Sequence, residues 1–158
     1  MRHFYLSCFV LAMLSNVAVA QEREWQLDAT DQDAFLVFGV PQSDDVGVSF
    51  WCKLGSKKLK VMAPVIKGRV KNDSNIPVVV QVGGKDYALN GRTAIGAKGS
   101  EDSVEAETQA KGPLIDALQE SDRFSVKVGG HEATYPLLDA DLDGLLRLCR
   151  ELPSEAQQ

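Results

Sequence analysis

Two cysteines, each on the inward side of a different kind of element, constrain the fold of this chain most. In Val46–Lys53 the side chains alternate at the period of a β-strand, and Cys52 belongs to the side that carries the valines and the phenylalanine. Near the other end, leucines recur at helical spacing in Leu142–Leu152, and Cys149 lies on their apolar stripe. The pattern predicts a disulfide that ties a C-terminal helix to a sheet.

The first twenty residues predict export. Residues 2–3 are a short basic start, residues 4–14 an apolar run, and Ala18-Val19-Ala20 a small-residue cleavage pattern. The run is shorter than the roughly 20 residues of a membrane span, and no later stretch reaches that length. We therefore expect no membrane span and a mature chain that begins at Gln21, in the periplasm or outside the cell.

The cysteine count agrees with a disulfide after export. Cys8 lies inside the apolar run, where a lipoprotein signal is disfavoured because almost no hydrophobic segment precedes it. Cleavage after Ala20 would remove Cys8 and leave Cys52 and Cys149, an even pair in an oxidising compartment.

The order of strand and helix patterns predicts a mainly β (α+β) fold. Some eight to ten short strands and two helices are expected, as a twisted antiparallel β-sandwich or a flattened barrel. Helices do not alternate with strands, which argues against a parallel α/β fold. Residues 21–152 are expected to form one domain, followed by a disordered tail at residues 153–158.

Individual elements follow from local signals. Strands are predicted at 25–29, 34–40, 46–53, 58–65, 66–70, 123–128 and 132–136, and around the Gly-Gly pair at 83–84. Helices are predicted from Pro113 to Ser121 and from a cap at Asp139 or Asp141 to Pro153. Residues 94–112 are rich in Gly, Ser and Glu, which predicts a mobile loop with one short strand near Val104.

One motif occurs twice. V-Q-V-G-G-K-D at 80–86 resembles V-K-V-G-G-H-E at 126–132, and each Gly-Gly pair between alternating runs predicts a tight hairpin. The repeat covers seven residues, so an internal duplication remains an open alternative.

The acidic run near the end resembles the start of a calcium loop. Asp139, Asp141 and Asp143 precede Gly144 with the right spacing, but Arg150 stands where the loop requires a bidentate Glu. We therefore reject a metal site and expect these carboxylates to cap a helix. Neither a cofactor nor a catalytic residue is expected, because His131 is the one histidine after the signal and no nucleophile motif accompanies it.

The segment from Lys53 to Lys71 holds seven basic residues and no acid, although the chain has a formal net charge of −5. Alternation directs most of them outward on neighbouring strands, on the same side as Trp51. Such a face predicts binding to an anionic envelope component or to a partner protein, whereas the overall charge argues against nucleic acid. The alternative is a solvated hairpin with Trp51 packed under Trp25 or a loop. The candidate binding residues are Trp51, Lys53, Lys58, Lys60, Lys67 and Arg69.

The second half resembles a known family. The pattern Leu114-x-x-Ala117-Leu118, Phe124-x-Val126-x-Val128-x-Gly130, Tyr135-Pro136-Leu137 and Leu145-x-x-Leu148-Cys149 is similar to small exported bacterial proteins related to invasion-associated protein B. The resemblance implies a periplasmic β-rich protein with a non-enzymatic role at the envelope or towards a host. The resemblance assigns no functional residue to this chain.

Three functions remain open. The first is an exported, non-enzymatic binding or envelope-maintenance protein that uses the basic face around Trp51. The second is a periplasmic inhibitor of a hydrolase such as lysozyme, because an acidic, disulfide-tied domain suits a basic enzyme. The third, and the least favoured, is a hydrolase that uses carboxylates on its loops.

Overall fold

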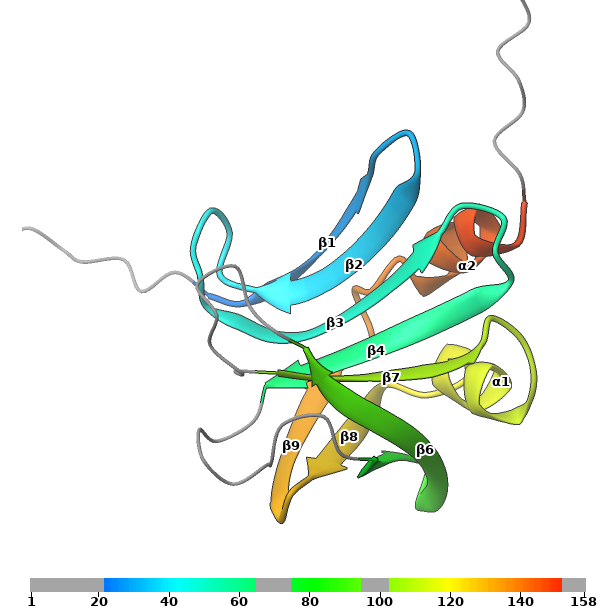
Figure 1. The fold of residues 1–158 in the computed structure, drawn as a ribbon. Coiled ribbons are helices and arrows are strands. Elements are labelled where there is room, and N and C mark those ends of the chain that lie inside the picture. The colour runs from blue at the N-terminus through cyan, green and yellow to red at the C-terminus, as the bar shows by residue number, and fades with distance from the viewer. Residues whose placement is uncertain (1–21, 65–74, 95–102, 152–158) are drawn as a thin grey trace, which may run out of the picture.

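The described residues form one nine-stranded antiparallel sheet and two helices. The computed structural model describes residues 22–64, 75–94 and 103–151 (Figure 1). The elements are β1 (Glu24–Ala29), β2 (Asp33–Gly39), β3 (Val46–Lys53), β4 (Lys58–Pro64), β5 (Ile76–Val82), β6 (Lys85–Ala94), β7 (Ser103–Gln109), α1 (Pro113–Gln119), β8 (Arg123–Val128), β9 (His131–Pro136) and α2 (Leu142–Arg150). Their order in the sheet is β1-β2-β3-β4-β7-β6-β5-β8-β9.

The sheet curls into a half-barrel, which confirms the mainly β prediction and favours the flattened barrel over two stacked sheets (Figure 1). Alternate side chains of each strand face the inside of the curl and are almost completely buried, among them Phe50 of β3 and Phe124 of β8. Both helices lie at the same end of the curl, where α2 packs against β2, β3 and β4 and α1 packs against β5.

The predicted disulfide is confirmed. Cys52 of β3 and Cys149 of α2 are bonded, with 5.7 Å between their Cα atoms, and both are buried. Two backbone bonds support the same junction, because the amides of Gly55 and Lys57 in the β3–β4 turn donate to the Leu148 and Cys149 carbonyls. The turn is thus attached to the end of the helix as well as to the sheet.

The first and last strands of the sheet approach one another at one point. The Trp25 indole Nε1 of β1 donates to the Pro136 carbonyl of β9 at 2.7 Å, and the buried Tyr135 hydroxyl donates to the Gly47 carbonyl of β3 at 2.9 Å. Tyr135 also contacts the Phe38 ring edge-on. These contacts form a seam that joins β9 to β1, β2 and β3.

Both Gly-Gly pairs form hairpin turns, as predicted. All four glycines have φ between 56° and 79°, a conformation that glycine adopts without steric cost. The inner strands of the two hairpins, β5 and β8, are neighbours. Val80 and Val126, which correspond in the two copies of the motif, are also direct cross-strand partners. A local two-fold axis at this pair therefore relates the hairpins.

The short strand predicted near Val104 is confirmed, but it is longer than expected and belongs to the interior of the sheet, not to a mobile loop. Residues 103–109 form β7, a seven-residue strand in the interior of the sheet between β4 and β6. Its inward side chains Val104 and Ala106 are small but buried, and its two outward acids, Glu105 and Glu107, pair with bases on the neighbouring strands. The expected signal peptide, the strand at 66–70, Pro153 and the tail lie outside the described residues.

Candidate functional site

The outer face of the sheet carries a row of five cross-strand partners. Asp28, Phe35, Trp51, Lys60 and Glu107 lie side by side on β1, β2, β3, β4 and β7. Side chains that are direct partners on one face come within contact distance. The row therefore places the Phe35–Trp51 pair between the Asp28 carboxylate and the Lys60 ammonium, on the outer face of strands β1 to β4.

Trp51 is held on both sides. Its ring stacks on Phe35 with 6.1 Å between centroids and 18° between planes, and the Lys60 Nζ lies 4.1 Å from the ring centroid. The alternative that Trp51 packs under Trp25 is wrong, because Trp25 lies inside the curl against Phe38 and Phe50. Trp51 is therefore a fixed, half-buried part of the outer face.

The lysines of β4 meet acids that are distant in sequence. Lys58 Nζ lies 2.8 Å from Glu107 Oε1, and Lys60 Nζ lies 2.9 Å from Glu105 Oε1, which also accepts from Arg92 at 3.1 Å. The described part of the predicted basic face therefore has mixed charge. Glu105 and Glu107 were not among the candidate site residues, because the sequence signal for β7 was weak.

Glu105 is the most enclosed acid of this network, with 12% of its side chain exposed. Burial alone would raise the pKa of Glu105, but the hydrogen bonds and positive charges of Lys60 and Arg92 outweigh it and hold the pKa below its ordinary value of 4.5. A carboxyl group that ionises this readily is poorly suited to act as a general acid near neutral pH. The arrangement therefore favours a structural role for Glu105.

A hollow of about 200 Å³ opens beside Trp51, and we call it the lysine hollow. Its lining consists of Trp51, Cys52, Lys53, Ser56, Lys58, Lys60 and Glu107. Lys53 is exposed and, within the described chain, forms no ion pair. The structure thus brings together four of the predicted binding residues, Trp51, Lys53, Lys58 and Lys60. Lys67 and Arg69 lie outside the described ranges.

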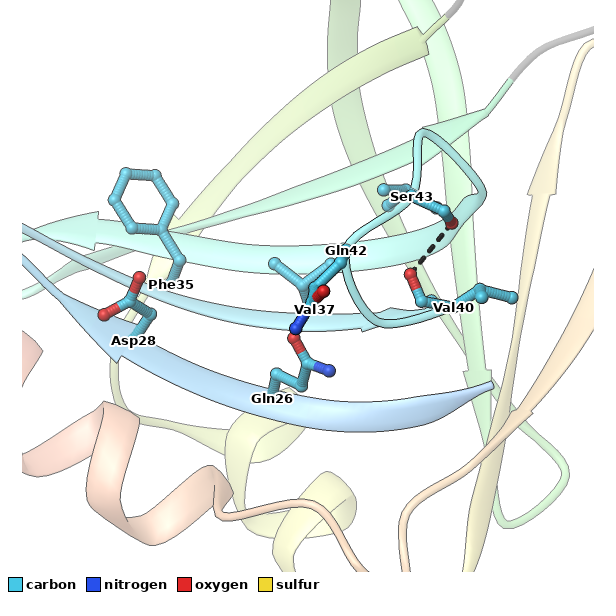
Figure 2. Close-up of a pocket in the computed structure, with 9 residues that line it drawn as sticks. Gln26, Asp28, Phe35, Val37, Val40, Gln42 and Ser43 are labelled. Carbon is cyan, nitrogen blue, oxygen red and sulfur yellow. Dashed lines mark hydrogen bonds between the residues drawn. The ribbon is translucent and has the colours of Figure 1, made fainter. Parts of the chain in front are cut away.

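A second hollow of about 250 Å³ lies on the other side of Phe35 (Figure 2), and we call it the amide hollow. Gln26 and Gln42 point toward one another there beside Val37, and Asp28 lies further along β1. Gln42 has a φ of 59°, which is uncommon for a residue other than glycine. Ser43 completes the rim, where its hydroxyl donates to the Val40 carbonyl at 2.9 Å. The two hollows are separated by the stacked Phe35–Trp51 pair.

The acidic run at 139–143 serves the start of α2. Asp141 is the N-cap, and its carboxylate accepts from the Gly144 amide at 2.9 Å. Asp143 accepts from the Gln119 side chain and so joins α2 to α1. Across the described ranges no three His, Cys, Asp or Glu side chains are grouped so that they could hold a metal ion, and none of the described helices is long and apolar enough to cross a membrane.

Comparison with family models, with curated proteins and with solved structures finds no match to this chain.

Proposed function

We propose that this protein is an exported, non-enzymatic binding protein of the cell envelope whose lysine hollow holds an anionic group of its ligand. The observation that carries the proposal is the hollow beside Trp51, whose lining includes three lysines, Ser56 and one carboxylate, that of Glu107, which pairs with Lys58. Lysine ammonium groups are hydrogen-bond donors, so the hollow can receive an acceptor, whereas the Ser56 hydroxyl already donates to the Lys58 carbonyl at 3.3 Å.

The overall charge makes a local site necessary. With a formal net charge of −5, the chain as a whole repels polyanions, so an anionic ligand requires a place where cations are concentrated. Lys53 supplies an ammonium there that forms no ion pair with any residue of the described ranges. Lys58 supplies a second one, because its ion pair with Glu107 leaves 54% of the lysine side chain exposed and is easily exchanged.

The test is retention of the mature protein on immobilised polyphosphate, polyglutamate and polygalacturonate, measured by surface plasmon resonance. The double variant Lys53→Gln/Lys58→Gln should lose about tenfold or more in affinity for whichever polyanion binds. Lys127→Gln is the matched control, because Lys127 is also an outward lysine in an ion pair, with Glu132 at 3.7 Å. Absence of retention on all three surfaces, or an equal loss in the control, would refute the proposal.

Export forms the second part of the proposal. The apolar run of residues 4–14 and the small residues before Gln21 support it, and the Cys52–Cys149 bond suits an oxidising compartment. The intact mass of the protein recovered from a periplasmic fraction should correspond to a chain that begins at Gln21. An uncleaved chain in the cytoplasmic fraction would contradict it.

A further inference from the structure

We propose that the ligand is an acidic polysaccharide, with one carboxylate-bearing sugar in the lysine hollow and the neighbouring sugars over Phe35 and in the amide hollow. This inference rests on the proposed function and names the chemical class of its ligand. It joins two hollows that lie on either side of one aromatic stack.

The chain itself supplies a carboxylate to the lysine hollow. Glu107 lines the hollow and pairs with Lys58 at 2.8 Å, and both side chains remain about half exposed, 43% and 54%. An exposed pair of this kind contributes at most about 1 kcal/mol. Glu107 therefore acts as an internal competitor, and a ligand carboxylate can replace it on Lys58 while also reaching Lys53. Lys60 is not available in this way, because it is engaged by Glu105 and by the Trp51 ring.

The size of the hollow favours a repeating ligand. A volume of about 200 Å³ is below the roughly 300–1,000 Å³ of sites that enclose a drug-sized molecule, so it accommodates a single small unit. Useful affinity then requires further units bound nearby. The amide hollow offers the second place, about 250 Å³ in volume, where Gln42 and, after exchange of its exposed 3.2 Å bond to Glu24, Gln26 can donate to and accept from sugar hydroxyls. Asp28 lines the same hollow, so a carboxylate on that sugar has to face the solvent.

The surroundings disfavour a phospholipid surface. Insertion into a membrane surface needs exposed large apolar side chains beside the cations. Within the described ranges the exposed large apolar residues are Val46 and Leu138; Val46 lies at the amide hollow, away from the lysines, and Leu138 lines neither hollow.

The decisive experiment titrates the mature protein by calorimetry with galacturonic acid, tetragalacturonate, dextran, polyglutamate and phosphatidylglycerol vesicles. Tetragalacturonate should bind about tenfold or more tightly than the monomer, polyglutamate and the vesicles, and dextran should not bind. Equal or tighter binding of polyglutamate or the vesicles would overturn the polysaccharide assignment and leave the proposed function standing. Failure of every anionic probe to bind would refute both.

Three variants test the arrangement itself. Glu107→Gln should raise the affinity for tetragalacturonate about threefold or more, because the competitor is lost, whereas Lys53→Gln should lower it about tenfold. Gln26→Ala should lower the affinity for tetragalacturonate and leave the affinity for galacturonic acid unchanged. The Lys127→Gln control should match the wild type, and all melting temperatures should be similar. Unchanged or weaker binding by Glu107→Gln would contradict the role of Glu107 as a competitor, and an equal effect of Gln26→Ala on both sugars would remove the second subsite.

Discussion

At the scale of single residues, Glu105 shows how a nearly buried charge is retained on an otherwise solvated sheet face. Its carboxylate accepts from Lys60 and Arg92, which belong to the two strands that flank β7. Desolvation opposes the charged form, and two cations in hydrogen-bonding contact restore it. One carboxylate thereby links three adjacent strands.

This arrangement makes stability depend on pH. The pKa of Glu105 is lower in the folded chain than its ordinary value of 4.5, so its contribution is complete above that value and is lost as the pH falls through the folded-state pKa. We expect Glu105→Gln to lower the unfolding free energy at pH 7 by about 1–2 kcal/mol and to flatten the loss of stability below pH 5. Urea unfolding from pH 7 to pH 3 measures both quantities.

The matched control is Glu107→Gln, which alters an acid of the same strand that pairs with one lysine and is 43% exposed. It should change stability by less than about 1 kcal/mol. An acid-side slope in Glu105→Gln that equals the wild-type slope would show that the Lys60–Glu105–Arg92 contacts do not stabilise the fold.

At the scale of elements, α2 is short and depends on its ends. Its nine residues begin at a capping carboxylate, and its last turn is attached to β3 by the disulfide and to the β3–β4 turn by backbone bonds. A helix of this length is not stable alone in water, so these attachments and the buried leucine stripe determine whether it forms.

The N-cap can be tested separately. Asp141→Ala removes the acceptor of the Gly144 amide and should lower the unfolding free energy by about 0.5–2 kcal/mol. Asp139→Ala is the control, because Asp139 is exposed and precedes the helix without capping it. Equal urea midpoints for the two variants would contradict the role of Asp141.

The elements also show what a sequence can predict. The strand at 46–53 and both Gly-Gly hairpins were predictable because their signals, alternation and turn glycines, are local. For β7 a short strand near Val104 was predictable, but its full length and its place between β4 and β6 were not, because its buried side chains are small and its pairing depends on strands distant in sequence. The same limit applies to the site. The lysines and Trp51 share one strand pair and were predictable, whereas Lys60 and Glu105 are 45 positions apart and meet only through the order of the sheet.

At the scale of the whole molecule, the disulfide joins the first half of the sheet to the end of the described chain. Its cysteines are 97 positions apart, so the bond restricts most of the unfolded domain. The chain-entropy estimate for such a loop is about 4–5 kcal/mol, and measured values are usually lower.

We expect the double variant Cys52→Ala/Cys149→Ala to be about 2–4 kcal/mol less stable than the oxidised protein in urea unfolding. The reducing agent TCEP should destabilise the wild type by a similar amount and should leave the double variant unchanged, which separates loss of the bond from loss of packing. Wild-type stability that is insensitive to reduction would contradict this contribution.

The Trp25–Pro136 hydrogen bond between β1 and β9 limits how far proteases can trim the N-terminus of the chain. Removal of residues up to Arg23 leaves β1 complete, whereas a cut after Trp25 deletes the indole that donates to the Pro136 carbonyl. The curl would then lose the hydrogen bond that joins its two outermost strands. Limited proteolysis followed by mass spectrometry should therefore give N-terminally trimmed products that begin no later than Glu24.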